Sequence, residues 1–224
     1  MATYRVFSYD KIPSTQTYAH NMIAAGDAAD HTAIVAESQT AGHGRYRRHW
    51  VSHHGNLYVS FIYGCARRDS RLSYAVAVAM AETVAAFGAP AQIKWPNDIL
   101  VDGKKIAGVL IEYNARFVVI GIGINIKHSP RVDKYQTAKL NDYCDVSRNV
   151  VLSTLMKKLD KWMMADFADV RVRWMELAAG LSHDVVYRDV AAKLVGIDEK
   201  GALVLQRGEQ YILVYGDEIT LQNP

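Results

Sequence analysis

Cysteine is almost absent from this chain, because its 224 residues include only Cys65 and Cys144. The two lie far apart, form no C-x-x-C pair and have no metal-ligand spacing with the eight histidines. A disulfide framework and a zinc site are therefore not expected. Two scattered thiols are typical of proteins that stay in a reducing cytoplasm.

Long hydrophobic runs are absent as well. The first twelve residues carry three charged side chains, so they do not form the apolar stretch of a signal peptide. The most apolar window, Ser73–Phe87, is rich in alanine, contains Glu82 and is too short to span a bilayer. The chain also lacks a large excess of charge of either sign, because it has 26 basic and 23 acidic residues and a net charge of +3. This weak excess predicts no nucleic-acid or membrane partner, and we expect a soluble, cytoplasmic protein.

Half of the residues are hydrophobic and 22% are charged, which is the balance of a globular protein. The length suits one ordinary domain with a small appendage. Helical and strand patterns alternate up to residue 180 and predict an α+β fold, a mixed sheet backed by helices. Helices are expected over Thr15–Ala25, Arg71–Phe87 and Val150–Ala179, and strands over Thr32–Ala36, Asn56–Tyr63, Gln92–Trp95, Ile99–Val101, Lys104–Tyr113 and Arg116–Ile126.

The pattern changes after Gly180 to short strands separated by turns. Strands are expected over Asp184–Arg188, Ala191–Ile197, Ala202–Gln206, Gln210–Val214 and Ile219–Leu221. Short strands at this spacing are typical of a small β-barrel. We therefore divide the chain into a first domain of residues 1–180 and a second of residues 181–224.

Residues 37–54 have no clear period and predict a long loop, a feature that is often functional. The loop contains Gly42–Trp50, which reads GHGRYRRHW. Its glycines let backbone N–H groups approach an anion, its arginines suit carboxylate or phosphate, and Trp50 offers a flat face to a planar base. A solvated basic loop and a nucleic-acid contact remain alternatives for this run taken alone.

The segment KWPND, Lys94–Asp98, follows a predicted strand that Pro96 ends. A turn that follows a core tryptophan is enough to explain this segment without any functional role. The functional alternative is a site in which Lys94 contacts a phosphate, Asn97 a base edge and Asp98 an amine.

Two further segments carry glycines inside predicted strands. In Gly103–Glu112 (GKKIAGVLIE), Lys104 and Lys105 are expected to point to opposite faces, and Gly108 allows the close approach of a ligand ring or a backbone. In Gly121–Ile126 (GIGINI), no helix follows and the third glycine of a dinucleotide motif is missing. These glycines predict room for a planar group, with Asn125 as a polar contact at the strand end.

In this order and spacing, the segments resemble the catalytic domain of biotin protein ligases, whose motifs read approximately GRGRxGRxW, KWPND, GKKxxGxLxE and GxGxN. The segment Ser14-Thr15-Gln16 is similar to the family's early STN segment, and the final strands are similar to its SH3-like barrel. The resemblance covers nearly the whole chain and implies a class II synthetase-like fold. The helix-turn-helix extension of the repressor members has no counterpart, so no repressor role is expected.

The resemblance implies a reaction in two steps. Biotin and ATP, with Mg²⁺ on the phosphates, form biotinyl-5′-AMP, and a lysine of a biotin carboxyl carrier domain then takes the biotin. The protein ligands of Mg²⁺ are not indicated. Some members form dimers through an exposed sheet edge, which leaves a homodimer open here.

The resemblance also implies roles for individual residues. Those implied to be catalytic are Lys105, which contacts both the biotin carboxylate and the α-phosphate, Arg45 and Asp98. Those implied to bind biotin are Ser14, Thr15, Gln16, Gln39, Gly42, His43, Gly44, Arg45, Lys105 and Gly108. Those implied to bind ATP or the adenylate are Arg45, Arg48, Trp50, Lys94, Asn97 and Asn125.

Two residues depart from the family's loop motif. His43 stands where the family has arginine, and Arg47 stands where it has glycine. If the backbone at position 47 needs a positive φ, a side chain there is costly. We therefore expect this enzyme to lose its adenylate faster than its relatives do.

Other functions remain open from the residues. A lipoate ligase or octanoyltransferase shares the fold, and a binding-only protein would sequester biotin or its adenylate. KWPND together with GxGxN favours biotin, and the presence of Lys105, Asn97 and Asp98 favours an enzyme. A nucleic-acid binder that uses Arg45–Arg48 lacks the broad basic surface that such binding needs.

Overall fold

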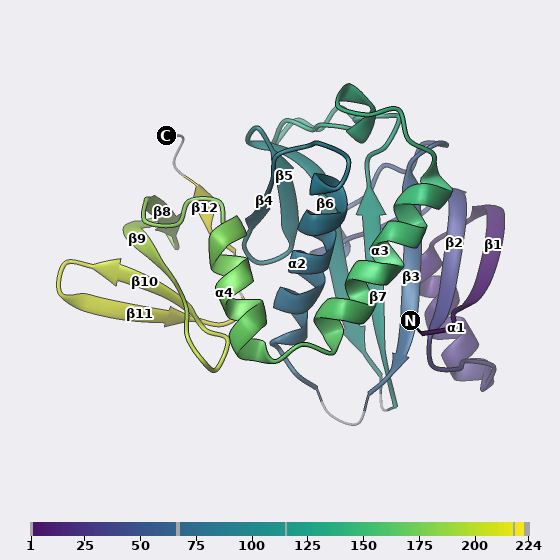
Figure 1. Cartoon of the computed structure of the whole chain (residues 1–224), viewed down its shortest axis with the longest axis horizontal. Helices are drawn as coiled ribbons and strands as arrows, with labels where there is room; N and C mark the ends of the chain where they lie inside the picture. Colours follow the sequence, from purple (N-terminus) through teal and green to yellow (C-terminus); the bar gives the residue numbers. More distant parts are fainter. Residues whose placement is uncertain (1, 66–67, 115, 217, 222–224) are drawn as a thin grey trace.

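The computed structural model describes residues 2–65, 68–114, 116–216 and 218–221. Its first part contains β1 (Arg5–Ile12), β2 (Thr32–Gln39), β3 (Leu57–Gly64), β4 (Ala91–Lys94), β5 (Asp98–Val101), β6 (Lys104–Tyr113) and β7 (Phe117–Ile124). These strands form one sheet in the order β1-β2-β3-β7-β6-β5-β4 (Figure 1). β1 and β2 run parallel and the other neighbours antiparallel, which confirms the predicted mixed sheet.

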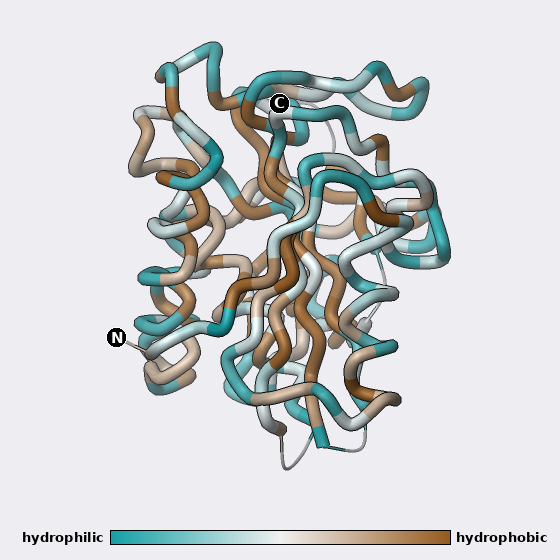
Figure 2. Tube along the Cα trace, turned by 90° about the vertical axis from the view of Figure 1, so that its right-hand side faces the viewer, coloured by the Kyte–Doolittle hydropathy of each residue, from teal (hydrophilic) through white to brown (hydrophobic). Residues whose placement is uncertain are grey.

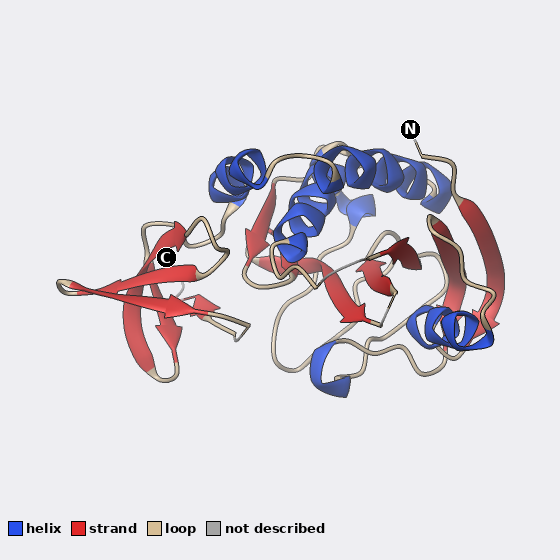
Figure 3. Cartoon of the chain, turned by 90° about the horizontal axis from the view of Figure 1, so that it is seen from below, coloured by secondary structure: helices blue, strands red, loops and turns tan. Residues whose placement is uncertain are grey.

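The two faces of this sheet pack against different helices. Because successive strand residues point to opposite faces, β2 contributes Ala33 and Val35 to one apolar cluster and Ile34 and Ala36 to another. Figure 2 shows apolar residues concentrated along the central strands and polar residues in the surrounding loops. α2 (Leu72–Ala85) and α3 (Arg148–Met163) cover one face with α4 (Phe167–Leu177) beside them, and α1 (Thr15–Ala25) lies on the opposite face (Figure 3). α1 packs on β2, β3 and β7 and leaves part of its face of the sheet uncovered.

Two features of this first part differ from the sequence prediction. β1 was not predicted, because it is an edge strand that buries only Ile12 and therefore lacks an apolar pattern. The helical region near Val150–Ala179 consists of two helices, α3 and α4, separated by Met164–Asp166. This break lets both helices pack against α2. None of the helices in the described part of the chain has the length and apolarity that a membrane-spanning segment needs.

The C-terminal residues form a second, five-stranded sheet. Its strands are β8 (Asp184–Tyr187), β9 (Val190–Ile197), β10 (Leu203–Arg207), β11 (Gln210–Val214) and β12 (Thr220–Leu221), which confirms the five predicted strands. Their order is β11-β10-β9-β8-β12, so the described strands do not close into the predicted barrel. Within the described ranges β12 pairs with β8 and β11 pairs with β10, and no pairing joins β12 to β11. The division at residue 180 stays a prediction, because the main apolar cluster includes buried residues from both sheets.

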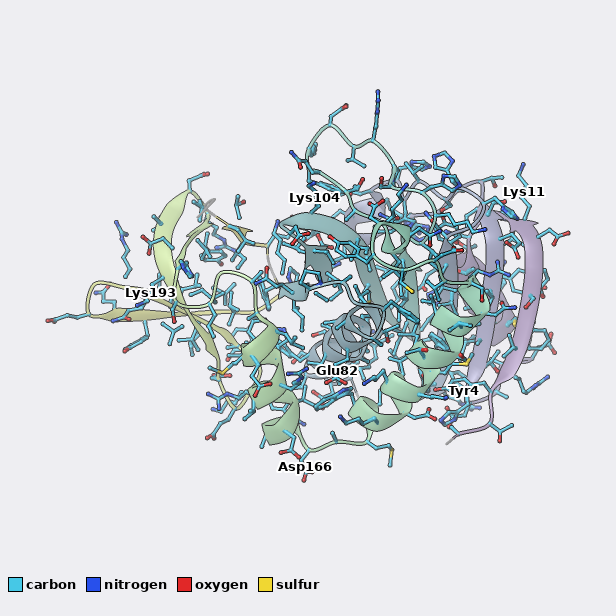
Figure 4. All side chains as sticks on the ribbon, turned by 45° about the horizontal axis from the view of Figure 1, so that its top comes forward. Tyr4, Lys11, Glu82, Lys104, Asp166 and Lys193 are labelled. Carbon is cyan, nitrogen blue, oxygen red and sulfur yellow. The ribbon has the colours of Figure 1, made fainter. Side chains whose placement is uncertain are left out.

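A buried carboxylate joins the three helices of the covered face. Glu82 is the only acidic residue of α2, an otherwise apolar and mostly buried helix. Its carboxylate accepts hydrogen bonds from Lys158 Nζ (2.9 Å) and Trp162 Nε1 (3.1 Å) on α3, and from Arg173 Nε (2.9 Å) on α4. A buried charge needs such partners, so Glu82 holds α2, α3 and α4 together (Figure 4).

We expect Glu82→Gln to destabilise the fold at neutral pH and to flatten its acid response. Burial alone would raise the pKa of Glu82, but the hydrogen bonds from Lys158, Trp162 and Arg173 lower it to about 2 from 4.5. A depressed pKa stabilises the folded state above about pH 4.5, and this contribution of about 3 kcal/mol disappears as the pH falls toward 2. Urea unfolding of both proteins at pH 7 and pH 3 measures the difference. An equal loss of stability in both proteins on acidification would contradict this prediction.

Candidate active site

A cavity of about 200 Å³ lies on the uncovered part of the sheet face that carries α1. Strands β6 and β7 form its floor, and the first turn of α1, the loop before β3, the β4–β5 turn and a C-terminal segment form its sides. The structure brings together here all the predicted site residues except Gly42 and Asn125. The predicted residues that line it are Ser14, Thr15, Gln16, Gln39, His43, Gly44, Arg45, Arg48, Trp50, Lys94, Asn97, Asp98, Lys105 and Gly108.

The cavity floor is a strip of bare backbone at three glycines. A Cβ atom on Gly123 would lie 2.6 Å from the Trp50 indole, and one on Gly108 would lie 3.2 Å from it. A Cβ atom on Gly121 would lie 2.5 Å from Gln16 Oε1. The planar group for which the glycines make room is thus the protein's own Trp50. The indole Nε1 of Trp50 is buried and finds no hydrogen-bond partner among the residues that the structure describes.

One end of the cavity presents neutral hydrogen-bonding groups. Ser14 caps α1, and the adjacent Thr15 backbone N–H donates to Gln39 Oε1 at 2.8 Å. Gln39 Nε2 donates to Ser52 Oγ at 2.9 Å, so both ends of this amide are oriented. Gly42 lies directly behind, where a Cβ would come within 2.6 Å of Ser52 Oγ. Gly42 therefore contributes to the site through its lack of a side chain.

A β-bulge turns Lys105 into the cavity. The pairing of β5 with β6 shifts register between Ile99 and Leu100, so that Ile99 pairs with Ala107 but Leu100 pairs with Lys105. The extra residue on β6 breaks strict alternation, as a bulge does. Lys105 consequently shares the cavity side of the strand with Gly108, and Lys104 remains exposed, as the sequence predicted for one lysine of the pair.

The Lys105 ammonium is surrounded by one carboxylate and two aromatic rings. Its Nζ lies 2.6 Å from Asp98 Oδ1, 5.3 Å from the centre of the Trp50 ring and 5.2 Å from that of Tyr135. The Lys105 side chain is 15% exposed, so it is a partly buried cation that needs an anionic partner. Asp98 supplies this partner and thereby fixes the ammonium at the centre of the cavity wall.

The basic loop reaches across to the C-terminal segment. Arg48 forms a two-pronged ion pair with Glu218, with its Nη1 3.0 Å from Oε1, and Arg45 Nη2 donates to the Gly216 carbonyl at 3.1 Å. Arg45 Nη1 is buried and lies 3.9 Å from Glu218 Oε1, but makes no hydrogen bond within the described part of the chain. Two guanidinium groups therefore stand at the cavity rim and share the Glu218 carboxylate, which Arg48 contacts more closely.

The backbone of this loop is left-handed at two residues that are not glycine. Tyr46 has a φ of 55° and Arg47 a φ of 56°. The sequence analysis expected a cost at position 47 if its backbone needs a positive φ, and position 47 does adopt this conformation, which favours glycine. Arg47 is not among the residues that line the cavity, but its Nη1 lies 3.4 Å from Nε2 of His43, which does line it.

The asparagines and Lys94 differ in how they meet the cavity. Lys94 and Asn97 both line it, and Asn97 Nδ2 also donates to the Val109 carbonyl at 2.8 Å. Asn125 is 2% exposed, and its Nδ2 donates to the Ala138 carbonyl at 3.0 Å. The structure thus places Asn125 behind the cavity wall, and its contact with a nucleotide stays a prediction.

Sequence reasoning missed several residues of the cavity. Tyr58 and Ser60 point inward from β3, and Tyr135 and Glu218 come from segments to which no role was given. The strand pattern NLYVSFIY placed Ser60 two positions after Tyr58, on the same face, which is the signal that could have found it. Tyr135 and Glu218 carried no such signal, since they reach the site only through tertiary contacts.

Comparisons with known proteins show which family the chain is similar to. The sequence profile of the Biotin/lipoate A/B protein ligase family matches residues 9–127. The bifunctional ligase/repressor BirA of Bacillus subtilis is 31% identical, over 95% of this chain and 73% of its own length. The biotin–[acetyl-CoA-carboxylase] ligase of Mycobacterium tuberculosis is 31% identical, over 88% of this chain and 81% of its own. A biotin protein ligase from Aquifex aeolicus, solved with biotin and ATP, superposes with a TM-score of 0.83 at 25% identity, over 98% of this chain and 99% of its own.

We expect Arg47→Gly to be more stable than Arg47→Ala, by about 1 kcal/mol. Both variants remove the arginine side chain, but only glycine removes the Cβ atom that opposes a positive φ. The alanine variant is therefore the matched control, and urea unfolding compares the two. Equal stability would show that the backbone at position 47 is not held in the left-handed region.

Proposed function

The chain belongs to the biotin/lipoate A/B protein ligase family, and we propose that it is a biotin protein ligase. It joins biotin and ATP into biotinyl-5′-AMP and then transfers the biotin to a lysine of a biotin carboxyl carrier domain. The observation that carries this function is the Lys105 ammonium, held in a cavity with one neutral and one cationic region. Relatives named as ligases and the solved complex with biotin and ATP support the same substrates.

The two regions suit the two parts of the adenylate. Thr15 and Gln39 offer neutral hydrogen-bonding groups, which match the neutral ureido ring of biotin. Lys94, Arg45 and Lys105 supply positive charge for the carboxylate and the phosphates. From Lys105 to Leu110 the cavity follows six residues of β6, whose five steps span roughly 16 Å. This length accommodates the biotin side chain between its ring and its carboxylate.

In the first step, a biotin carboxylate oxygen attacks the α-phosphorus of ATP and pyrophosphate leaves. Two anions must meet, so the barrier falls if a fixed cation touches both. Lys105 is placed to do this, and it would exchange Asp98 for the substrate oxygens. Holding the reactants together in this way can contribute roughly 7–11 kcal/mol in favourable systems.

In the second step, the carrier lysine amine attacks the acyl carbon, an amide bond forms and AMP leaves. The amine must lose a proton and approach from one side. Asp98, once Lys105 has turned to the adenylate, has a carboxylate available to orient this amine. This role for Asp98 rests on its 2.6 Å contact with Lys105 and on its place in the cavity lining.

Magnesium is proposed only as the companion of the ATP phosphates. Among the described residues (2–65, 68–114, 116–216 and 218–221), no three His, Cys, Asp or Glu side chains gather as metal ligands. We therefore name no protein ligand for the ion. The cytoplasm is the proposed setting, and the outer edge of β1 is the proposed contact if the enzyme forms a homodimer.

We expect the protein to form biotinyl-5′-AMP from biotin, ATP and Mg²⁺ and to biotinylate one lysine of an added carrier domain. Mass spectrometry detects both products, and lipoate and octanoate run in parallel test the related acylations. Adenylate from lipoate or octanoate alone would overturn the biotin assignment. Biotin binding without any adenylate would leave a binding-only protein.

We expect Lys105→Ala to slow adenylate formation by about 100- to 1,000-fold, the usual loss when one charge-stabilising group is removed. Lys104→Ala is the matched control, because Lys104 is the exposed neighbour on the same strand. Its rate should stay within twofold of the wild type. Equal losses in the two variants, measured as pyrophosphate release, would contradict a specific role of Lys105.

We expect Glu218→Gln to speed adenylate dissociation by up to about fivefold, since a partly exposed ion pair contributes up to about 1 kcal/mol. The loop then loses its ionic contact with the C-terminal segment but keeps all its own residues. Stopped-flow release of the adenylate measures this rate, with Glu209→Gln on the exposed β10–β11 turn as the control.

The same assay on Arg47→Gly tests the expectation that Arg47 speeds the loss of the adenylate, because relief of the strained φ at position 47 should slow its release.

A further inference from the structure

The chain after β7 folds back against the part of β6 that carries Lys105. The pairing of β7 with β6 reaches the Ala107–Ile124 pair, so Lys105 lies beyond its end. A later segment fills this place. The Lys105 N–H donates to the Gln136 carbonyl at 2.9 Å, and the Ala138 N–H donates to the Lys105 carbonyl at 3.0 Å. The backbone of Lys105 is therefore held between β5 and this segment.

The same segment reaches the Lys105 side chain. Tyr135 directly precedes Gln136, and the centre of its ring lies 5.2 Å from Lys105 Nζ. Residues 126–138, which we call the return segment, thus contact both the peptide and the ammonium of Lys105. The position of this ammonium depends on where the return segment lies.

A buried amide holds the start of the return segment. Asn56 directly precedes β3 and is 0% exposed. Its Oδ1 accepts hydrogen bonds from three successive backbone N–H groups, those of Ile126 (2.9 Å), Lys127 (3.0 Å) and His128 (3.0 Å). Its Nδ2 donates to the His128 carbonyl at 2.9 Å. One side chain therefore satisfies four backbone groups that would be costly to leave without partners.

A hydroxyl joins the start of the return segment to its end. Thr137 Oγ1 donates to the Pro130 carbonyl at 2.6 Å, and Thr137 lies beside Lys105 in a parallel bridge. Pro130 is two residues beyond His128, the last residue that Asn56 holds. A short line of contacts thus leads from Asn56 through Pro130 and Thr137 to the backbone of Lys105.

We propose that Asn56 is a positioning residue for adenylation, which acts on Lys105 through the return segment. Asn56 is not among the residues that line the cavity, so it acts without touching a substrate. It fixes the start of the segment, and the end of the segment fixes the peptide of Lys105. This inference rests on the proposed function, because it takes Lys105 as the group that brings biotin and ATP together.

The test is a double-mutant cycle on the adenylation rate, measured as pyrophosphate release at saturating biotin and ATP. Asn56→Ala should lower this rate about 10- to 100-fold, since a misplacement of about 1 Å can cost about 100-fold. In the Lys105→Ala background, the same change should lower the rate by less than about twofold, because Lys105 is no longer there to be positioned. A merely structural role would reduce the rate by the same factor in both backgrounds. That outcome, or no loss in Asn56→Ala, would overturn the inference.

Two further variants keep the test decisive if Asn56→Ala is unstable. Asn56→Asp keeps an acceptor for the three N–H groups, so its rate should stay within about fivefold of the wild type. Thr137→Val removes only the contact with Pro130, at a half-buried position, and should lower the rate about fivefold, the usual contribution of one hydrogen bond. An aspartate variant as slow as the alanine variant, together with an unaffected Thr137→Val, would contradict the proposed line of contacts.

Asn141→Ala is the matched control. The Asn141 side chain contacts Asp145, and its backbone N–H donates to the Ile126 carbonyl, a bond that alanine keeps. Its adenylation rate should therefore match the wild type. The wild-type reaction separates the two possible failures. If the wild type forms no biotinyl-5′-AMP, the proposed function fails; if it does and Asn56→Ala acts equally with and without Lys105, only this inference fails.

Discussion

The absence of side chains on one strip of the sheet is the constraint on which the site depends. Gly108, Gly121 and Gly123 leave the backbone of β6 and β7 bare on the α1 side. Trp50 and Gln16 lie directly on this strip, and the cavity opens beside them. The opposite side of the same strands carries the buried apolar residues that pack beneath α2. The two strands therefore serve the core on one face and the site on the other.

The charges of the site are paired in advance. Asp98 holds Lys105, and Glu218 holds Arg48 from the segment before β12. A partly buried cation such as Lys105 would be costly without a partner, so Asp98 stabilises it. An anionic ligand then exchanges one partner for another instead of meeting a bare charge. The contacts of Arg45 and Arg48 also tie the loop to the C-terminal segment, although the two lie about 170 residues apart in the chain.

Much of the fold could be predicted because local pattern and tertiary structure agree there. The five C-terminal strands are short alternating segments bounded by turns, and the structure has all of them. Prediction was incomplete where exposure or packing overrides pattern. β1 is mostly exposed, so its sequence carries little apolar signal. The break between α3 and α4 serves packing against α2, and the C-terminal strands do not close into a barrel because their order ends at β11 and β12.

By itself, the sequence determined the family, the order of the motifs and most of the residues that line the cavity. It could do so because these glycine-, arginine- and lysine-containing motifs, in this order and spacing, are typical of one family. It also placed a costly residue, Arg47, at a position whose φ is positive. The resemblance implied Lys105 as the lysine of the site, and only the tertiary structure showed how it enters the cavity, since strict alternation would put Lys104 on the side of Gly108 and a one-residue bulge in β6 puts Lys105 there instead. The structure likewise put Asn125 behind the wall and brought Tyr135 and Glu218 to the site. Contacts between segments that are distant in the chain leave no local sequence pattern, so these contacts could not be predicted from the sequence.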